Sequence, residues 1–526
     1  MCHFPLPFSY IVRFICFLMK NTIFVPFKAS FYNAGMLSVV LDYATQRVKD
    51  GNDIVLAYCD GKLFHRCSHN MSANKAICRC CMLYKKLLFK YMPKKNVQYL
   101  PFSKFSDSVK NNYSIDFNSV EDLKKLEYKN VKIGYAVFSS YLTLSRNLFP
   151  EINEEFKDYM RKALTVICQY VDVAEAIMQE TKPDVVECHN SRTIQARPIV
   201  DLARSYHIPY ICSEQKFNTK NQQVKVSFES TVHDVDENTL YIDRLWNSDK
   251  FSPECKKKVA ESFFYKRRNS IASGDKLYVK DQKQGLLPEN WDEKKHNICI
   301  LNSSEDEFAS LGEDFEKGSL FNSQYEGIKC LIDRYEHQEG YHFYLRVHPN
   351  LKNVKYRYHT ALYKLFENKS NFTIIPADSP ISTYAVIDAS DKVIVFGSTT
   401  GPEASYAGKP VVLLSKCIYS KLDCCYIPQN LDEMDSLILD RNLVAKPLLN
   451  ALKYGYYRYN DEEELNQYCG HSLTSKKIGN HRFDYSKYSG FTFFDKILSF
   501  AYQVVGKKLY YKHLSFPRKE SLSEEV

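Results

Sequence analysis

The sequence is poor in the residues and motifs that mark several protein classes. Its 526 residues include only 18 glycines, 19 prolines and 2 tryptophans. Glycine and proline counts this low exclude collagen-like and linker-like chains. No G-x-x-x-x-G-K-[ST] is present and no G-x-G-x-x-G follows an expected strand, so neither an NTPase nor a dinucleotide oxidoreductase is indicated. H-E-x-x-H and G-x-S-x-G are also absent, which disfavours hydrolases.

Long uncharged hydrophobic runs are missing too. Arg13 and Lys20 interrupt the apolar stretch of residues 4–27, so its uncharged runs are shorter than the roughly 20 residues of a membrane-spanning helix. No basic segment precedes this stretch and no small-residue cleavage site follows it. The sequence therefore predicts a cytoplasmic protein without a membrane span.

The composition is that of a folded globular chain. Hydrophobic residues make up 44% and charged residues 25%. The length predicts two or three domains. The net charge of +9, from 71 Lys and Arg against 62 Asp and Glu, is spread along the chain. It does not indicate nucleic-acid binding, which usually needs a concentrated basic stripe, but it fits a mild attraction to anionic membrane surfaces.

Short β-branched or aromatic runs alternate with helical periods in the first half of the chain. Strands are expected at residues 21–27, 53–58, 184–188 and 209–213, and helices at 35–48, 156–179 and 192–206. The alternation is typical of βαβ units with a parallel sheet. The first half is therefore predicted to be an α/β domain.

The alternation is clearest after a polar, charged stretch at residues 215–295. Strands are expected at residues 297–301, 342–347, 372–376, 392–396 and 410–414. With right-handed crossovers such a series forms a doubly wound parallel sheet. The predicted fold is therefore α/β, with two Rossmann-like domains facing a cleft. We expect a first Rossmann-like domain at 1–245, a linker region at 246–295, a second Rossmann-like domain at 296–450 and a helical tail at 451–526.

The helical tail carries an apolar stripe. Its members are Phe494, Ile497, Leu498, Ala501, Val505 and Leu509, and it leads into Lys507, Lys508 and Lys512. One interpretation is a helix that packs back on the body of the protein. The other is a contact with a membrane surface, which the basic end and nearby tyrosines favour.

Ligands of open α/β sheets bind at the carboxyl ends of the strands, and three loops there have unusual content in the second domain. Ser303 and Ser304 follow the first strand and can offer hydrogen-bond donors to a phosphate. Arg346 and His348 end the second strand, where Pro349 fixes the chain direction. An imidazole at that place can donate to a phosphate oxygen or stabilise a departing one.

The third loop follows residues 392–396 and begins a helix. Ser398, Thr399 and Thr400 lie between glycines, and Gly401 opens a helix start that suits an anion. Glu403 is placed to accept hydrogen bonds from ribose hydroxyls. Helix capping explains each loop singly. Together, the three loops predict a site for a nucleotide leaving group.

A cysteine cluster stands out in the first domain. Cys59, Cys67, Cys78 and Cys81 include one C-x-x-C, and four thiolates can hold zinc or an iron–sulfur cluster. A single C-x-x-C with irregular partners is a weak signal. Buried, reduced thiols without metal are the alternative.

The blocks NSSEDEFASLG, LRVHPN and ISTYAVIDASDKVIVFGSTTGPEASYAGKPVVLL, between residues 297 and 426, carry a family resemblance. They resemble the bacterial capsule and lipopolysaccharide polysaccharide biosynthesis family, GT-B glycosyltransferases related to the capsular Kdo transferases. The resemblance implies that His348, Ser398 and Thr399 contact the phosphate and nucleotide of an activated sugar. It further implies that the first domain binds the acceptor and supplies a base.

The first choice for that base is Glu214, which follows an expected strand end. A structural role for Glu214 is the alternative, and His189, Glu187 and Asp234 are its rivals as base. We expect transfer without a metal, since Arg346, His348 and the helix start at Gly401 can take the charge that magnesium would neutralise.

The predicted function is transfer of a sugar from a nucleotide-sugar donor to a capsule or lipopolysaccharide (O-antigen) glycan or its lipid-linked precursor. The predicted location is cytoplasmic, with a peripheral position at the inner membrane as an option. A nucleotide-sugar epimerase of the same architecture is one alternative, and a non-catalytic polysaccharide assembly factor is another.

Overall fold

The computed structural model describes most of the chain, with short gaps. The described residues are 22–27, 44–45, 47–62, 66–67, 70–90, 93–110, 112–216, 223–271, 278–460, 474–477, 480–483 and 493–513. The predicted helix at 35–48 lies largely outside them. The predicted helical tail at 451–526 lies partly outside them, as does residue 21 of the first predicted strand, and the remaining predicted strands and helices lie within them.

The first half of the chain forms a six-stranded sheet. Its strands are β1 (Thr22–Phe27), β2 (Asp53–Tyr58), β3 (Val97–Pro101), β4 (Val185–His189), β5 (Tyr210–Lys216) and β6 (Gln223–Phe228). The spatial order is β3-β2-β1-β4-β5-β6, and every pairing is parallel except that of β5 with β6. The four predicted strands are confirmed to within one residue at their starts, while β3 and the antiparallel β6 were not predicted.

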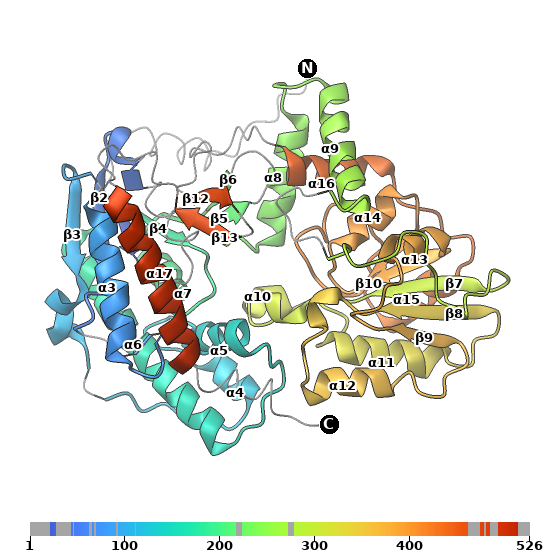
Figure 1. Ribbon diagram of the computed structural model, residues 1–526, viewed down its shortest axis with the longest axis horizontal. Coiled ribbons are helices and arrows are strands. Elements are labelled where there is room, and N and C mark those ends of the chain that lie inside the picture. Colours follow the sequence, from blue (N-terminus) through green and yellow to red (C-terminus); the bar gives the residue numbers. More distant parts are fainter. Residues whose placement is uncertain are drawn as a thin grey trace.

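Helices cover this sheet on both faces (Figure 1). They are α3 (Lys75–Phe89), α4 (Val120–Lys125), α5 (Ile133–Ser145), α6 (Glu154–Thr181) and α7 (Arg197–Ser205), with the 3-10 helix η1 (Phe102–Ser108). Asn153 caps the long helix α6 by accepting a hydrogen bond from the Phe156 N–H, 2.9 Å away. Apolar residues of α6 recur at helical spacing and are buried against the sheet and neighbouring helices.

The second half forms a five-stranded parallel sheet. Its strands are β7 (His296–Leu301), β8 (Tyr341–Arg346), β9 (Phe372–Ile375), β10 (Lys392–Val395) and β11 (Val411–Leu413). All five predicted strands are confirmed to within one residue at each end. Their order is β11-β10-β7-β8-β9. The helices of this half include α10 (Glu313–Glu316), α11 (Gln324–Tyr335), α12 (Arg357–Lys364), α13 (Thr383–Ala389), α14 (Thr400–Tyr406) and α15 (Leu431–Leu439).

Both sheets reverse their winding direction once. In the first sheet the chain runs outward from β1 to β3 and then continues on the other side of β1 with β4. In the second sheet it runs from β7 to β9 and then continues beside β7 with β10. Such a reversal opens a crevice at the carboxyl ends of the two strands involved, where α/β proteins bind ligands. The fold therefore has two Rossmann-like domains, as predicted.

The stretch expected to end the first domain and link it to the second belongs to the core of the second. Residues of α8 (Val235–Asn247) and α9 (Pro253–Arg268) are buried with strands β7 and β10 and with α16 (Leu448–Tyr459). Gly455 permits this packing, because a Cβ there would lie 2.6 Å from the Phe264 ring and 3.0 Å from the Ala260 carbonyl oxygen. Because the sequence of these two helices is largely polar, their buried face could not be predicted from it. The packing against α16 identifies that face.

The chain then returns to the first domain. A two-stranded antiparallel ribbon, β12 (Thr474–Lys477) and β13 (Asn480–Phe483), precedes α17 (Phe493–His513). Helix α17 lies beside α3 of the first domain (Figure 1). This confirms the predicted packing of the C-terminal helix on the body of the protein. Within the described part of the chain, every helix is too short or too polar to cross a bilayer.

Candidate active site

The three polar loops follow three neighbouring strands. Strand β7 lies between β10 and β8, and all three run in parallel. Because parallel strands lie about 5 Å apart, the loops after β10 and β8 start only about 10 Å from each other. The loops that contain Ser304, His348 and Ser398 therefore share one edge of the sheet, next to its crevice.

His348 is held in place at both its backbone and its ring. Its backbone N–H donates to Oδ1 of Asn302, 2.7 Å away, and the Asn350 N–H donates to the ring Nδ1 at 3.2 Å. Since Nδ1 accepts, the neutral ring carries its proton on Nε2. The Tyr278 ring meets the imidazole edge-on, with centroids 4.9 Å apart. His348 is thus fixed as a hydrogen-bond donor through Nε2.

Three cations surround this imidazole. Burial, and then Arg146, Arg267 and Arg346, lower the pKa of His348 to about 4. The ring is therefore neutral at pH 7. Asp306, the ion-pair partner of Arg146, opposes the effect of the three arginines but is weaker than each of them, and Arg267 pairs with Glu403. An anion is the ligand that such an environment favours.

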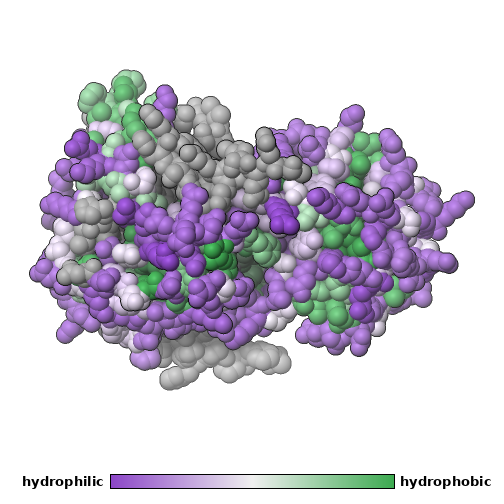
Figure 2. Space-filling model, turned by 90° about the horizontal axis from the view of Figure 1, so that it is seen from below, coloured by the Kyte–Doolittle hydropathy of each residue, from purple (hydrophilic) through white to green (hydrophobic). Residues whose placement is uncertain are grey.

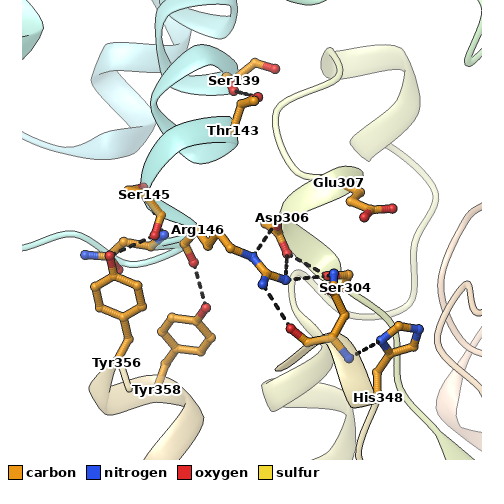
Figure 3. Close-up of polar contacts among 12 residues, drawn as sticks. Ser139, Thr143, Ser145, Arg146, Ser304, Asp306, Glu307, His348, Tyr356 and Tyr358 are labelled. Atoms are coloured by element: carbon orange, nitrogen blue, oxygen red, sulfur yellow. Dashed lines mark hydrogen bonds and ion pairs between the residues drawn. The ribbon is translucent and has the colours of Figure 1, made fainter. Parts of the chain in front are cut away.

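Arg146 enters this site from the first domain, at the end of α5 (Figure 3). It adopts a left-handed conformation with φ of 63° and caps α5. Its guanidinium donates to Oγ of Ser304 at 2.7 Å, to both oxygens of Asp306 at 3.1 Å and to the Asn350 carbonyl oxygen at 3.0 Å. One side chain thereby links the loops after β7 and β8 to the first domain.

Ser304 and Ser303 are both engaged within the protein. Ser304 Oγ also accepts from the Asn350 amide at 2.9 Å and lies 3.0 Å from Asp306 Oδ1. Ser303 is hydrogen-bonded twice to Gln324, through its N–H at 2.9 Å and its Oγ at 2.7 Å. The two serines fix the shape of the loop, and their contact with a donor stays a prediction.

Glu305 follows them in the same loop and has an unusual titration. Burial raises the pKa of Glu305 to about 7, although the Gln324 N–H donates to Oε1 at 3.1 Å. A pKa above the usual value for an acid means that the folded protein holds a proton which the unfolded chain releases. The free energy of unfolding should therefore fall as pH rises from about 4.5 to 7.

We expect Glu305→Gln to remove this pH dependence, because glutamine keeps the hydrogen-bond acceptor and cannot ionise. The difference in unfolding free energy between variant and parent should grow by up to about 3 kcal/mol between pH 5 and pH 8. Urea titrations across this range measure it, with Glu121→Gln on the exposed side of α4 as the matched control. A constant difference at all pH values would show that Glu305 does not titrate in this window.

The loop after β10 is built around buried hydroxyls. Ser398 Oγ lies 2.7 Å from Thr400 Oγ1, and the Gly401 N–H donates to the Ser398 carbonyl oxygen at 3.0 Å. The buried Tyr419 hydroxyl donates to the same carbonyl oxygen. Thr399 and Thr400 are half-buried. The loop is rigid at its base, and the contact of Ser398, Thr399 and Thr400 with a nucleotide stays a prediction.

Gly401→Ala should disturb this base. A Cβ at position 401 would lie 2.6 Å from the Tyr419 hydroxyl oxygen and 3.1 Å from the carbon that bears it. We expect a loss of about 1–3 kcal/mol of stability, the usual cost of overpacking, seen as a lower thermal midpoint. Tyr419→Phe removes the closer of the two contacts, so the double variant should recover part of the loss. No recovery in the double variant would argue against this steric explanation.

Two predicted ligand residues point into the protein instead. Arg346 is 2% exposed and donates to the carbonyl oxygens of Pro376, Val347 and Ser379, which hold the loop after β9. Glu403 is also 2% exposed. Its Oε1 lies 3.0 Å from Nη2 of Arg267, and its Oε2 accepts from the Tyr384 hydroxyl. These hydrogen bonds favour structural roles for Arg346 and Glu403. They do not support the predicted binding of a nucleotide by either residue.

The candidate base lies across from these loops within β5, which continues beyond the predicted strand end at residue 213 to Lys216 and pairs Glu214 with Lys225 of β6. Oε2 of Glu214 accepts from the Asn190 amide at 2.8 Å, and Oε1 is 3.9 Å from Nε2 of His189. Asn190 has φ of 60°, and its Oδ1 accepts from the N–H groups of Ser191 and Arg192. Since β4 and β5 are neighbours, the strand ends bring Glu214 and His189 together.

The rivals of Glu214 have other surroundings. Glu187 is 3% exposed, and burial raises its pKa well above the usual value, which favours the neutral acid. Asp234 caps α8 by accepting from the Glu237 N–H at 3.0 Å. Both arrangements are structural. Of the rivals, only His189 lies beside Glu214 in the part of the chain that the structure describes.

The carboxyl ends of the two sheets meet each other. Arg192, in the loop after β4, donates to the Glu307 carbonyl oxygen at 3.0 Å. Burial lowers the pKa of Arg192, and the charges of Glu214, Glu307 and Asp306 act against this shift. The Tyr358 hydroxyl donates to the Arg146 carbonyl oxygen at 2.9 Å. Seen from below, the two domains form lobes with a recess between them (Figure 2). The candidate base and the candidate anion site thus lie on facing loops.

The cysteine cluster lies in the first domain and its thiols are half-buried. Among the described residues, no three or more His, Cys, Asp or Glu side chains are grouped so that they could hold a metal ion. Burial raises the pKa of Cys59 and of Cys81, and Cys78 Sγ accepts from the Asn70 amide at 3.1 Å. Cys59, Cys67 and Cys78 also raise the pKa of Cys81, and a zinc or iron–sulfur site on Cys59, Cys67, Cys78 and Cys81 stays a prediction.

Sequence reasoning missed Arg146, Arg267 and Tyr278, which all surround His348. Arg146 follows an apolar helix and Arg267 ends a basic one, so neither carries a motif. A cation at the end of a helix is common for local reasons. These residues lie near His348 only because segments far apart in the sequence come together in the fold.

Comparison with known proteins finds a family model that matches part of the chain. Residues 211–423 match the family described as "Capsule polysaccharide biosynthesis protein". The match includes β7 to β11 and all three polar loops, and it confirms the resemblance seen in the sequence. No curated protein matches the chain.

The solved structures that the chain matches are distant in sequence, and their TM-scores are low. The β-Kdo 2,4-transferase KpsC of Thermosulfurimonas dismutans is 14% identical with a TM-score of 0.34, over 52% of this chain and 79% of that one. MurG of Acinetobacter baumannii is 13% identical with a TM-score of 0.24, over 83% and 94%. The UDP-GlcNAc 2-epimerase of Neisseria meningitidis bound to UDP-GlcNAc is 11% identical with a TM-score of 0.21, over 86% and 96%.

Proposed function

We propose that this protein, whose residues 211–423 match the capsule polysaccharide biosynthesis family, is a glycosyltransferase that uses a nucleotide-sugar donor. The observation that carries the proposal is the neutral, half-buried His348, fixed as an Nε2 donor near three arginines on a loop that faces Glu214's domain. A phosphate leaving group is the anion that this arrangement suits.

The donor binds in the second domain under this proposal. Its phosphate lies against the Nε2 proton of His348, and its nucleotide lies over the loop of Ser398, Thr399 and Thr400. Arg146 and Arg267 supply positive charge nearby, which offsets the charge of the departing phosphate. For this reason we propose transfer without a metal ion.

The acceptor binds in the first domain. Glu214 removes the proton from an acceptor hydroxyl as its oxygen attacks the anomeric carbon of the sugar. The bond from that carbon to the phosphate oxygen breaks, and the nucleotide leaves with the electron pair. The acceptor we propose is a capsule or lipopolysaccharide glycan, or its lipid-linked precursor, on the cytoplasmic side of the inner membrane.

A ligand panel with purified protein tests the donor. We expect one of the CMP-, UDP- or GDP-linked sugars to raise the thermal midpoint, because a ligand that binds the native state stabilises it. Free nucleotide should then be released only when a glycan acceptor is added. Conversion of the sugar without acceptor would instead identify an epimerase, and donor binding without any turnover would identify an assembly factor.

A further inference from the structure

Helix α17 presents hydrophobic side chains on two opposite faces. The face against the body of the protein contains Leu498, Tyr502, Gly506 and Leu509, which are half-buried or buried. The opposite face contains Phe493, Ile497, Phe500 and Val504, which are exposed. Each row follows the i, i+4, i+7 or i+8, i+11 spacing of one side of a helix. Packing on α3 therefore accounts for only one of the two rows.

The exposed row is unusual for this molecule. Phe493 is 79% exposed and Phe500 is 56% exposed. Six exposed large hydrophobic side chains lie on this one helix, namely Phe493, Phe494, Ile497, Phe500, Val504 and Val505. In the view from below, hydrophobic side chains project from the molecule at the upper left, on the side where α17 lies (Figure 2). A contiguous apolar ridge of this kind marks an interaction surface.

The neighbouring helix α3 supplies positive charge. Lys75, Arg79 and Lys86 are exposed and recur at the spacing of one helix face, which Lys90 continues just past the helix end. The helix contains no Asp or Glu. Helix α3 packs against α17 (Figure 1), so the exposed cations of α3 and the exposed apolar side chains of α17 lie on neighbouring helices.

We infer that the paired surface of α3 and α17 docks this protein on a bilayer that contains anionic lipids. The apolar ridge of α17 enters the boundary between headgroups and acyl chains, and the cations of α3 meet the lipid phosphates. A protein partner or a second copy would meet the ridge as well, but the acid-free helix α3 beside it favours a surface that is uniformly negative. The inference rests on these two helices and holds whatever reaction the site performs.

Co-sedimentation with vesicles tests the inference on the full chain. We expect binding to phosphatidylcholine vesicles to strengthen by about tenfold or more when phosphatidylglycerol is included, and to weaken at high salt. The double variant Ile497→Asp/Phe500→Asp should lose at least about tenfold in binding to the mixed vesicles. Its matched control is Leu448→Asp/Leu449→Asp, which changes two exposed leucines of α16.

A charge-reversed pair separates the role of α3. Lys75→Glu/Arg79→Glu should lose most of the gain that phosphatidylglycerol brings, whereas Lys257→Glu/Lys258→Glu, on the exposed side of α9, should not. Unchanged thermal midpoints would show that the variants fold. Equal binding by the α17 variant and its control would overturn the inference. So would a dimer in sedimentation velocity that Ile497→Asp/Phe500→Asp dissociates, since a second copy would then cover the ridge.

Discussion

Substitution of His348 by alanine is expected to lower kcat/KM for sugar transfer by roughly 100- to 1,000-fold, the usual effect of removing one donor that stabilises a developing negative charge. The Asn350 N–H holds Nδ1 as an acceptor, so Nε2 presents the proton. Because the pKa of His348 is about 4, the ring is neutral throughout pH 6 to 9. The loss should therefore be the same across that range, and steady-state kinetics at several pH values measure it.

Two controls keep this result interpretable. His337→Ala changes a histidine whose side chain is 92% exposed, and it should leave transfer unchanged. His348→Asn can keep a hydrogen-bond donor and should recover part of the activity. If His348→Ala transfers sugar within about twofold of the parent while folding normally, His348 does not stabilise the leaving group, and the proposed donor site is wrong.

The strands were predictable because buried parallel strands have a strong local signal. Both faces of such a sheet are covered, so each strand appears as a short, nearly continuous apolar run. Strand β8, for example, is buried along its whole length and was predicted at 342–347. The regular alternation with helices predicted that the three loops follow parallel strands of one sheet. It did not predict the order that places β10 next to β7, which the fold reveals.

The orientation of single side chains could not be predicted in the same way. Glu403 is predicted from the sequence to contact a ligand because it lies in the first turn of a helix. In the structure its carboxylate instead pairs with Arg267, 136 residues away in the sequence. Arg146 contacts Ser304 across 158 residues and from the other domain. Helices α8 and α9 joined the second domain for the same reason, since α16 covers them. The residues that flank a side chain in the sequence do not indicate which distant residue it will contact.

Replacement of Glu214 by glutamine is expected to lower kcat by about 10²- to 10⁴-fold, the range that general bases contribute. Glutamine keeps the size of the side chain and an oxygen that can accept from the Asn190 amide, so the local structure should persist. The nucleotide is bound by the other domain under the proposed function. The donor affinity should therefore stay within about twofold of the parent, and binding titrations beside turnover measurements separate the two effects.

The surroundings of Glu214 make its rivals distinguishable in the same assay. Glu187→Gln should leave kcat nearly unchanged, because Glu187 is buried away from the crevice and its raised pKa favours the neutral acid. Asp234→Ala should cost about 1 kcal/mol of stability through the lost cap of α8, again without a large change in kcat. If Glu214→Gln retains full turnover and His189→Gln does not, the base is His189, whose Nε2 lies 3.9 Å from the same carboxylate. A loss of turnover in either variant would place the base on β4 or β5. Full turnover in both variants would show that the base does not lie at the crevice of the first domain.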